Sequence, residues 1–249
     1  MSRKPAAEAA GAVFRDGLGQ PIGFPVPGWE RRPRPTRTPM KGTYSRVEPI
    51  DPDRHAADLY HANLEDTEQR IWAYLAYGPF ETPADYRAWM EATCLGDDPL
   101  FHAVIDLAQG TAAGVASFLR IDPPAGVIEV GHINFAPPLQ NTAAATEAMY
   151  LMMRRVFDEL GYRRYEWKCD ALNARSRRAA ERLGFRLEGV FRQATVYKGR
   201  NRDTAWFSIL DSEWPALRRA FEDWLDPGNF DSQGRQRQRL SELTGGARA

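Results

Sequence analysis

The most informative stretch of this sequence is VIEVGHINFAPPLQNTAAATEA, residues 127–148, which passes from a strand pattern to a helix pattern through two prolines. Its first nine residues are mostly apolar and β-branched, which favours a strand. Gln140 to Thr142 and three alanines then open a helix whose first amides have no partner inside the helix. Because these side chains are small, a phosphate could reach those amides, although Asn141 or Thr142 acting as a plain helix N-cap explains the same residues.

Outward from this stretch, strand and helix patterns alternate. Helical spacing runs on from Ala145 to Leu160 and stops at Gly161, a residue that favours a helix C-terminus. The expected strands are 44–49, 99–107, 111–121, 127–135, 163–170 and a hairpin over 187–211, and the other expected helices are 53–64, 84–93, 173–184 and 213–225. This order predicts an α+β fold with a single mixed, mostly antiparallel sheet flanked by helices.

The composition excludes several classes of protein. Lys plus Arg and Asp plus Glu both number 33, so the net charge gives no general attraction to nucleic acid or anionic lipid. The two cysteines, Cys94 and Cys169, form neither a disulfide framework nor a metal motif, and no segment is long and apolar enough to span a membrane. We therefore expect a cytoplasmic protein without a metal, and a homodimer is left open.

The chain divides into three parts. Residues 1–42 are rich in Gly, Pro and Arg and predict an extended arm, part of which lies against the domain through its apolar side chains. Residues 43–226 form the domain itself. The Gln- and Arg-rich tail, residues 227–249, is expected to be loosely ordered.

Two motifs in this order resemble the GNAT superfamily of N-acetyltransferases. QNTAAATEA is similar to its acyl-CoA loop, with Gln140 at the first position, Ala145 at the last, and Ala143 where the family usually has Gly. WKCDALNARSRRAAERLGFRLEGVFR is similar to the ribosomal-protein N-acetyltransferase branch. The matching residues of this second motif are Asn173, Ser176, Gly184, Phe185, Glu188 and Gly189.

The resemblance implies a splayed sheet in which acetyl-CoA enters between two diverging central strands, and an amine that attacks the thioester. It implies that backbone amides at Ile133, Asn134 and Phe135 hold the pantetheine arm and the oxyanion. The implied phosphate loop consists of Gln140, Asn141, Thr142, Ala143, Ala144, Ala145 and Thr146. Asn173 would bond the pantetheine or cap its helix, and Ser176 would bind the cofactor and donate to the leaving sulfur, because Ala180 stands where many members have Tyr.

The catalytic base is less defined. Glu129, in a mostly apolar strand, is the leading candidate, because burial can raise a carboxylate pKa toward neutrality, and a cross-strand ion pair is the alternative. Alternation places His132 on the opposite face from Glu129 unless a bulge intervenes. Cys169 is expected to be a buried strand residue and not a nucleophile.

Two other classes of function stay open. One is a non-catalytic acyl-CoA sensor, which would bind the same cofactor without turnover. The other is RNA binding through the arginines of NARSRRAAERL, although these residues also fit the solvated face of an amphipathic helix. The sequence leaves a protein amino terminus, a small amine and an antibiotic open as the acceptor, because acceptor specificity depends on loops that vary within one fold.

Overall fold

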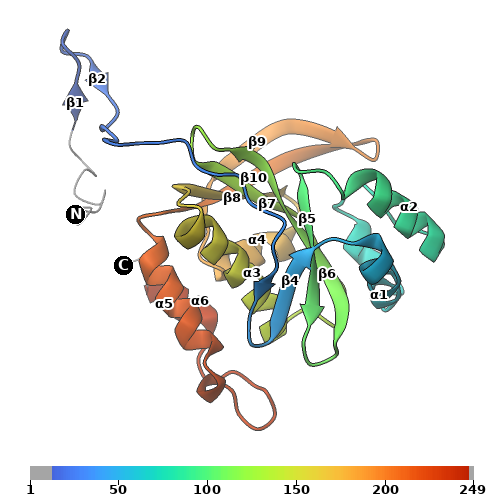
Figure 1. Ribbon diagram of the computed structural model, residues 1–249. Helices are drawn as coiled ribbons and strands as arrows, with labels where there is room; N and C mark the ends of the chain where they lie inside the picture. Colours follow the sequence, from blue (N-terminus) through green and yellow to red (C-terminus); the bar gives the residue numbers. More distant parts are fainter. Residues whose placement is uncertain (1–12, 247–249) are drawn as a thin grey trace.

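The computed structural model describes residues 13–246 and contains one eight-stranded sheet (Figure 1). Its strands are β3 (Met40–Lys41), β4 (Ser45–Pro49), β5 (Leu100–Asp106), β6 (Thr111–Asp122), β7 (Val127–Phe135), β8 (Arg164–Asp170), β9 (Arg186–Tyr197) and β10 (Arg200–Leu210). Their order across the sheet is β3-β4-β5-β6-β7-β8-β10-β9. Neighbours are antiparallel except β7 and β8, which are parallel, so the predicted mixed, mostly antiparallel sheet is confirmed.

Helices cover both faces of the sheet. The longer ones are α1 (Pro52–Leu64), α2 (Pro83–Thr93), α3 (Ala143–Arg154), α4 (Ala174–Arg182), α5 (Trp214–Leu225) and α6 (Leu240–Gly246). Short turns of helix lie at Arg70–Trp72, Arg155–Glu159 and Pro227–Asn229. The buried residues of α1 and α2 pack on one face of β5 and β6, whereas α3 to α6 share a larger core with the opposite face.

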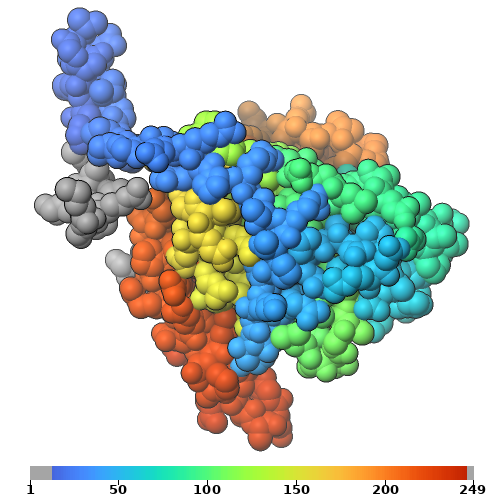
Figure 2. Space-filling view, in the orientation of Figure 1, coloured from blue at the N-terminus to red at the C-terminus, as the bar shows by residue number. Residues whose placement is uncertain are grey.

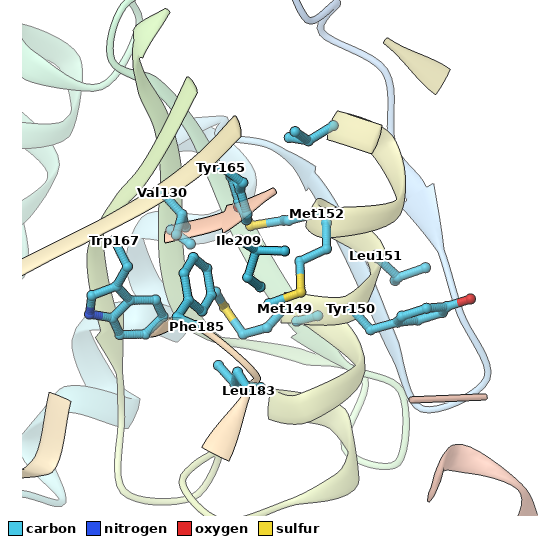
Figure 3. Close-up of a cluster of buried hydrophobic side chains, with 14 of the residues drawn as sticks. Val130, Met149, Tyr150, Leu151, Met152, Tyr165, Trp167, Leu183, Phe185 and Ile209 are labelled. Carbon is cyan, nitrogen blue, oxygen red and sulfur yellow. The ribbon is translucent and has the colours of Figure 1, made fainter. Parts of the chain in front are cut away.

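The larger core fixes α3 against the centre of the sheet. Met149 and Met152 reach from α3 toward Phe185 and Ile209, and all four side chains are buried (Figure 3). Unbranched methionines adapt to irregular gaps, so the face of α3 that carries them follows the twist of the strands. The start of α3 is thereby held at the edge where β7 ends.

Glu147 connects α3 to the first strands of the domain. Its carboxylate accepts the amides of Thr43, Tyr44 and Ser45, each at 2.7 Å, and the Ser45 hydroxyl at 3.1 Å. A Cβ added at Gly42 would lie 2.3 Å from the Glu147 carboxyl carbon, so a larger residue there would displace this carboxylate from its position. This buried acid is a structural anchor.

The described part of the arm runs along the domain and then leaves it (Figure 2). Trp29 lies over Gly126 and donates its indole Nε1–H to the carbonyl of Pro124 at 2.8 Å. Further toward the N-terminus, β1 (Phe14–Arg15) and β2 (Pro21–Ile22) form a two-stranded hairpin that projects from the body. Residues 1–12 and 247–249 lie outside the described residues.

The tail differs from the loosely ordered segment that its composition suggests. It folds back into α6, where Leu240 is buried and the Thr244 hydroxyl donates to the carbonyl of Arg182 at 3.1 Å. The indole of Trp224 donates to the side chain of Gln236 at 2.9 Å. These contacts join the tail to α4 and α5.

Candidate active site

The two parallel strands at the centre of the sheet separate partway along their length. β7 and β8 pair from Val127 and Arg164 to Val130 and Trp167, and no pair follows. β8 stays paired with β10 up to Asp170. Residues 131–135 of β7 therefore face a gap, which is the splay that the sequence implied.

A β-bulge in β7 lies at the start of this gap. The register with β6 shifts between the pairs Ser117–Gly131 and Val115–Asn134, and His132 has a φ of 50°. An extra residue in one strand reverses the alternation that follows it. The bulge is the exception that the alternation argument allowed, and it returns His132 to the same face as Glu129.

The contacts of His132 agree with this placement. Its ring lies between those of Tyr77 and Phe101, with centroid separations of 5.8 and 4.9 Å, on the α1/α2 side of the sheet. Burial, and then the charge of Arg120, lower the pKa of His132 to about 4. The imidazole is neutral at neutral pH.

The backbone of β7 presents amides to the gap. Ala136 donates its amide to the carbonyl of Ala113 on β6 at 2.9 Å. Because successive amides of an extended strand point in opposite directions, those of Ile133 and Phe135 point away from β6, toward the gap. The amide of Asn134 points toward β6, so two of the three predicted backbone donors are placed to bind a ligand.

The Asn134 side chain instead faces α1. Its Nδ2 donates to Oδ1 of Asn63 at 3.2 Å, and its own Oδ1 is buried without a partner among the described residues. Asn63 also borders a surface pocket, together with Asp66 and Trp72. The α1/α2 face of the gap thus has its own polar lining.

The start of α3 lies beside the end of β7. Thr142 is the N-cap: its Oγ1 accepts the amide of Ala145 at 3.0 Å and donates to the Leu139 carbonyl at 2.7 Å. Asn141 has a φ of 62°, and Gln140 donates its Nε2–H to the carbonyl of Phe135 at 2.8 Å. The turn is therefore shaped by its own side chains.

Some backbone amides of the predicted phosphate loop donate to acceptors within the protein, and others do not. The amides of Gln140, Ala145 and Thr146 all donate to acceptors within residues 136–142. Across the described chain, the amides of residues 141–144 have no protein acceptor. Four adjacent free N–H groups at the positive end of a helix dipole can bind an anion.

Asn173 and Ser176 lie where α4 begins, after the end of β8. Asn173 caps the helix by accepting the amide of Ser176 at 3.1 Å, while its Nδ2 donates to no acceptor in the described chain. Ser176 Oγ accepts the indole N–H of Trp167 at 3.0 Å. The Ser176 hydroxyl also forms a hydrogen bond with the Cys169 thiol, so a ligand would compete with Cys169 for the hydroxyl hydrogen. Asn173 has both a capping atom and a free donor.

Glu129 belongs to a buried ladder of charges. It is 3% exposed and accepts from Arg120 at 2.7 Å, and Lys168 Nζ lies 2.7 Å from its other oxygen. Lys168 also pairs with Glu166 at 2.9 Å and lies 3.7 Å above the ring of Trp206. Arg120 and Lys168 compete with any substrate ammonium for the oxygens of Glu129, and this favours the ion-pair interpretation. The role of Glu129 as a base stays a prediction.

No local pattern in the sequence marks Arg120 or Lys168 as partners of Glu129. The spacing of Arg164, Glu166 and Lys168 at every second position does indicate one polar strand face. The register that brings this face beside Glu129 depends on long-range pairing, so the sequence could not supply it.

The two thiols are unsuited to nucleophilic catalysis. Burial raises the pKa of Cys94 to about 12, and burial also raises that of Cys169 despite the nearby Ser176 hydroxyl. A thiol in this state is mostly protonated and unreactive at neutral pH.

Within residues 13–246, no group of three or more His, Cys, Asp or Glu side chains is arranged to hold a metal ion. In the same range, none of the helices combines the length and hydropathy that crossing a bilayer requires.

Comparison with known proteins identifies close relatives. Residues 46–186 match the family model described as an acetyltransferase (GNAT) domain. A GCN5-related N-acetyltransferase from Brucella melitensis is 50% identical, with 88% of this chain and all of that one aligned at a TM-score of 0.86. A probable acetyltransferase of the GNAT family from Chromobacterium violaceum is 39% identical over 79% of this chain and 98% of its own, with a TM-score of 0.73.

A curated Bacillus subtilis protein is also similar. It is named "Putative ribosomal N-acetyltransferase YdaF" and is 26% identical over 69% of this chain and 92% of its own length.

Proposed function

The chain belongs to the GNAT acetyltransferase family and is an acetyl-CoA-dependent N-acetyltransferase, and from this premise we propose that it acetylates the amino terminus of a protein by direct attack in a ternary complex. The observation that carries this proposal is the end of the β7–β8 pairing after Val130, which leaves the outer part of β7 without a partner strand on that side. One face of the sheet has the starts of α3 and α4, and the other has the α1/α2 side.

Acetyl-CoA fits the α3/α4 face. The free amides of residues 141–144 would hold its phosphates, and the pantetheine would then run along the gap past Asn173. The free Nδ2 of Asn173 would donate a hydrogen bond to an amide oxygen of the pantetheine arm. Bound there, acetyl-CoA supplies an activated acyl carbon beside the amides of Ile133 and Phe135.

The protein's own groups then stabilise the charges of the reaction. The amides of Ile133 and Phe135 would donate to the carbonyl oxygen as it becomes an oxyanion. The Ser176 hydroxyl, with its oxygen fixed by the Trp167 indole, would donate to the sulfur as it leaves. Direct attack is favoured over a covalent enzyme intermediate because both thiols are buried with raised pKa values.

The acceptor would approach from the α1/α2 face. The name of the similar Bacillus subtilis protein, which aligns over 92% of its own length, supports a ribosomal acceptor. The choice of the amino terminus rests on the pKa of its amine. An α-amino group has a lower pKa than a lysine side chain, roughly 8 against roughly 10.4, so more of it is neutral near pH 7. The site can therefore distinguish the two amines by reactivity as well as by shape.

The experiment is a thiol-release assay with acetyl-CoA and three peptides of one sequence: free amino terminus, blocked amino terminus with one lysine, and both blocked. We expect turnover with the first alone, with the acetyl group located by mass spectrometry. Equal turnover of the lysine peptide contradicts terminal selectivity, and turnover of small amines alone contradicts a protein acceptor. Acetyl-CoA binding without turnover of any amine would identify the sensor that the sequence left open.

A further inference from the structure

Asp170, the last residue of β8, lies at the mouth of the gap. It is 6% exposed. Trp167 and Cys169 face the larger core, so strand alternation places Lys168 and Asp170 on the opposite, α1/α2 face. This is the face from which the acceptor would approach.

The register of the parallel strands locates Asp170 relative to β7. The last pair joins Val130 to Trp167, and three further residues lead from Trp167 to Asp170. Three residues beyond Val130 is Ile133, and the extra residue of the bulge moves the matching position to Asn134. Asp170 therefore lies across the gap from the backbone donors that would hold the oxyanion.

The carboxylate of Asp170 differs from the other buried acids nearby in its partners. Tyr197 donates its hydroxyl to Oδ2 at 2.9 Å, and the amide of Leu172 donates to Oδ1 at 2.8 Å. In the described part of the chain, no arginine or lysine forms an ion pair with Asp170, whereas Glu129 and Glu166 each have two cationic partners. Asp170 is thus a buried acid whose negative charge has only neutral donors.

Resting on the proposed function, we propose that Asp170 receives the ammonium of the acceptor and takes its proton, and that Tyr197 is the positioning residue for this carboxylate. Proton transfer to Asp170 leaves a neutral amine, whose lone pair forms the new C–N bond to the acetyl carbon. The C–S bond then breaks, the nitrogen releases its second proton to solvent, and the thiolate takes up a proton. Atoms and charges balance without any other reactant.

The surroundings of Tyr197 suit this role. Burial first, and then the hydrogen bond to Asp170, raise the pKa of Tyr197 to about 12, so its hydroxyl remains a donor at neutral pH. The hairpin tip next to it is attached to the segment after α1, because Lys198 Nζ donates to the carbonyl of Trp72 at 2.9 Å. Tyr74 donates to the carbonyl of Leu172 at 3.3 Å from the same segment. These contacts enclose Asp170, so a slender chain end would reach it more readily than a residue within a folded surface.

The test uses Asp170→Asn with two acceptors that differ in proton affinity: an alkylamine and an alkoxyamine of matched length, the second being uncharged at neutral pH. Asp203→Asn is the matched control, because Asp203 also accepts a backbone amide, from Gln193 at 2.7 Å, but lies exposed on the hairpin. We expect Asp170→Asn to lower kcat/KM for the alkylamine on the order of 10²-fold. The loss with the alkoxyamine should be at most a few fold, because no proton has to be removed before attack.

Two further measurements separate this role from a structural one. The dissociation constant for acetyl-CoA should be unchanged in Asp170→Asn, and Tyr197→Phe should show the same preference for the alkoxyamine with a smaller loss, roughly 3- to 10-fold. Equal losses with both nucleophiles, or no loss with either, would overturn the proposal. If peptides prove not to be acceptors, the comparison with small amines is unaffected, so the two proposals fail separately.

Discussion

Placing a carboxylate at Ala143 should weaken acetyl-CoA binding without weakening the fold. Ala143 is the first residue of α3, and its amide is one of the four free donors at the helix start. An aspartate there would repel a bound phosphate: at a separation of roughly 6 Å and an effective dielectric constant of about 20, two unit charges interact by about 3 kcal/mol. Solvent and salt reduce this figure, so we expect a loss of about 1 to 3 kcal/mol, or roughly 5- to 150-fold in Kd.

The same charge should have the opposite effect on stability. An acidic side chain in the first turn of a helix is favourable by about 0.3 to 1 kcal/mol, so Ala143→Asp should unfold at the same or a slightly higher denaturant concentration. Ala143→Asn, which has the same shape without the charge, is the matched control. Calorimetric titration with acetyl-CoA at low and high salt completes the test, because the difference in Kd between the two variants should become smaller as the salt concentration rises.

Two results would refute this reasoning. Equal weakening by Asn and Asp would mean that the loss comes from bulk and not from charge. Unchanged affinity in a folded Ala143→Asp variant would mean that the phosphates bind elsewhere and that the free amides of α3 serve no ligand.

Three further tests address the other site residues and the anchor of α3. Asn173→Ala should mainly raise the apparent KM for acetyl-CoA, whereas Ser176→Ala should lower kcat with near-normal acetyl-CoA affinity, because charge on the sulfur exists only late in the reaction. If the kinetic constants of both variants match those of the wild type, the two residues only cap the helix. Glu129→Gln should lower the free energy of unfolding by about 2 kcal/mol, because Lys168 keeps Glu166 as a second carboxylate partner. The shape of the pH-rate profile should not change, and a selective loss of rate at low pH would restore Glu129 as the base. Glu147→Ala should cost about 2 to 4 kcal/mol in urea unfolding, because it leaves the buried amide of Ser45 and the partly buried amides of Thr43 and Tyr44 without their acceptor. The exposed Glu91→Ala should cost less than about 0.5 kcal/mol, and similar losses in both would contradict the anchor.

The fold was predictable because its signals are local. Apolar alternation, helical spacing and the glycine after each of two helices identify the elements within a few residues, and their order restricts the sheet to few arrangements. The site followed only where its donors lie close together in the chain, as at Gln140 to Ala145 and at Asn173 to Ser176. The caps that the structure shows are Thr142, one of two candidates from the sequence, and Asn173, for which capping was one of two interpretations.

Features that depend on long-range pairing were not predictable. The bulge that turns His132 toward the face of Glu129 adds one residue to a regular pattern, and nothing in VIEVGHINF indicates where the addition falls. Asp170 and Tyr197 are 27 residues apart and meet because both flank β10. The register of strand pairing decides which residues meet across the sheet, and a shift of one residue would change every such pair.

The tail shows the same limit for a helix. α6 has only seven residues, too few to be stable in isolation, and its polar surroundings suggest a segment without fixed structure. It is held by contacts outside itself, among them the buried side chain of Leu240 and the bond from Thr244 to the Arg182 carbonyl. Helix propensity cannot anticipate stability that comes from tertiary packing.

The departure from the family at Ala180 has a structural counterpart in Trp167. Ala180 is fully buried, one helical turn after Ser176, in a core that also includes Trp167 and Phe185. Protein cores are packed about as densely as organic crystals, so a tyrosine at this position would displace one of these neighbours. The indole ring of Trp167, 5.6 Å from that of Phe185, belongs to this core and directs its N–H to the Ser176 oxygen. A chain that lost the tyrosine hydroxyl would thereby keep an oriented hydroxyl group on the same helix face, which is the physical argument for Ser176 as the proton donor to the leaving sulfur.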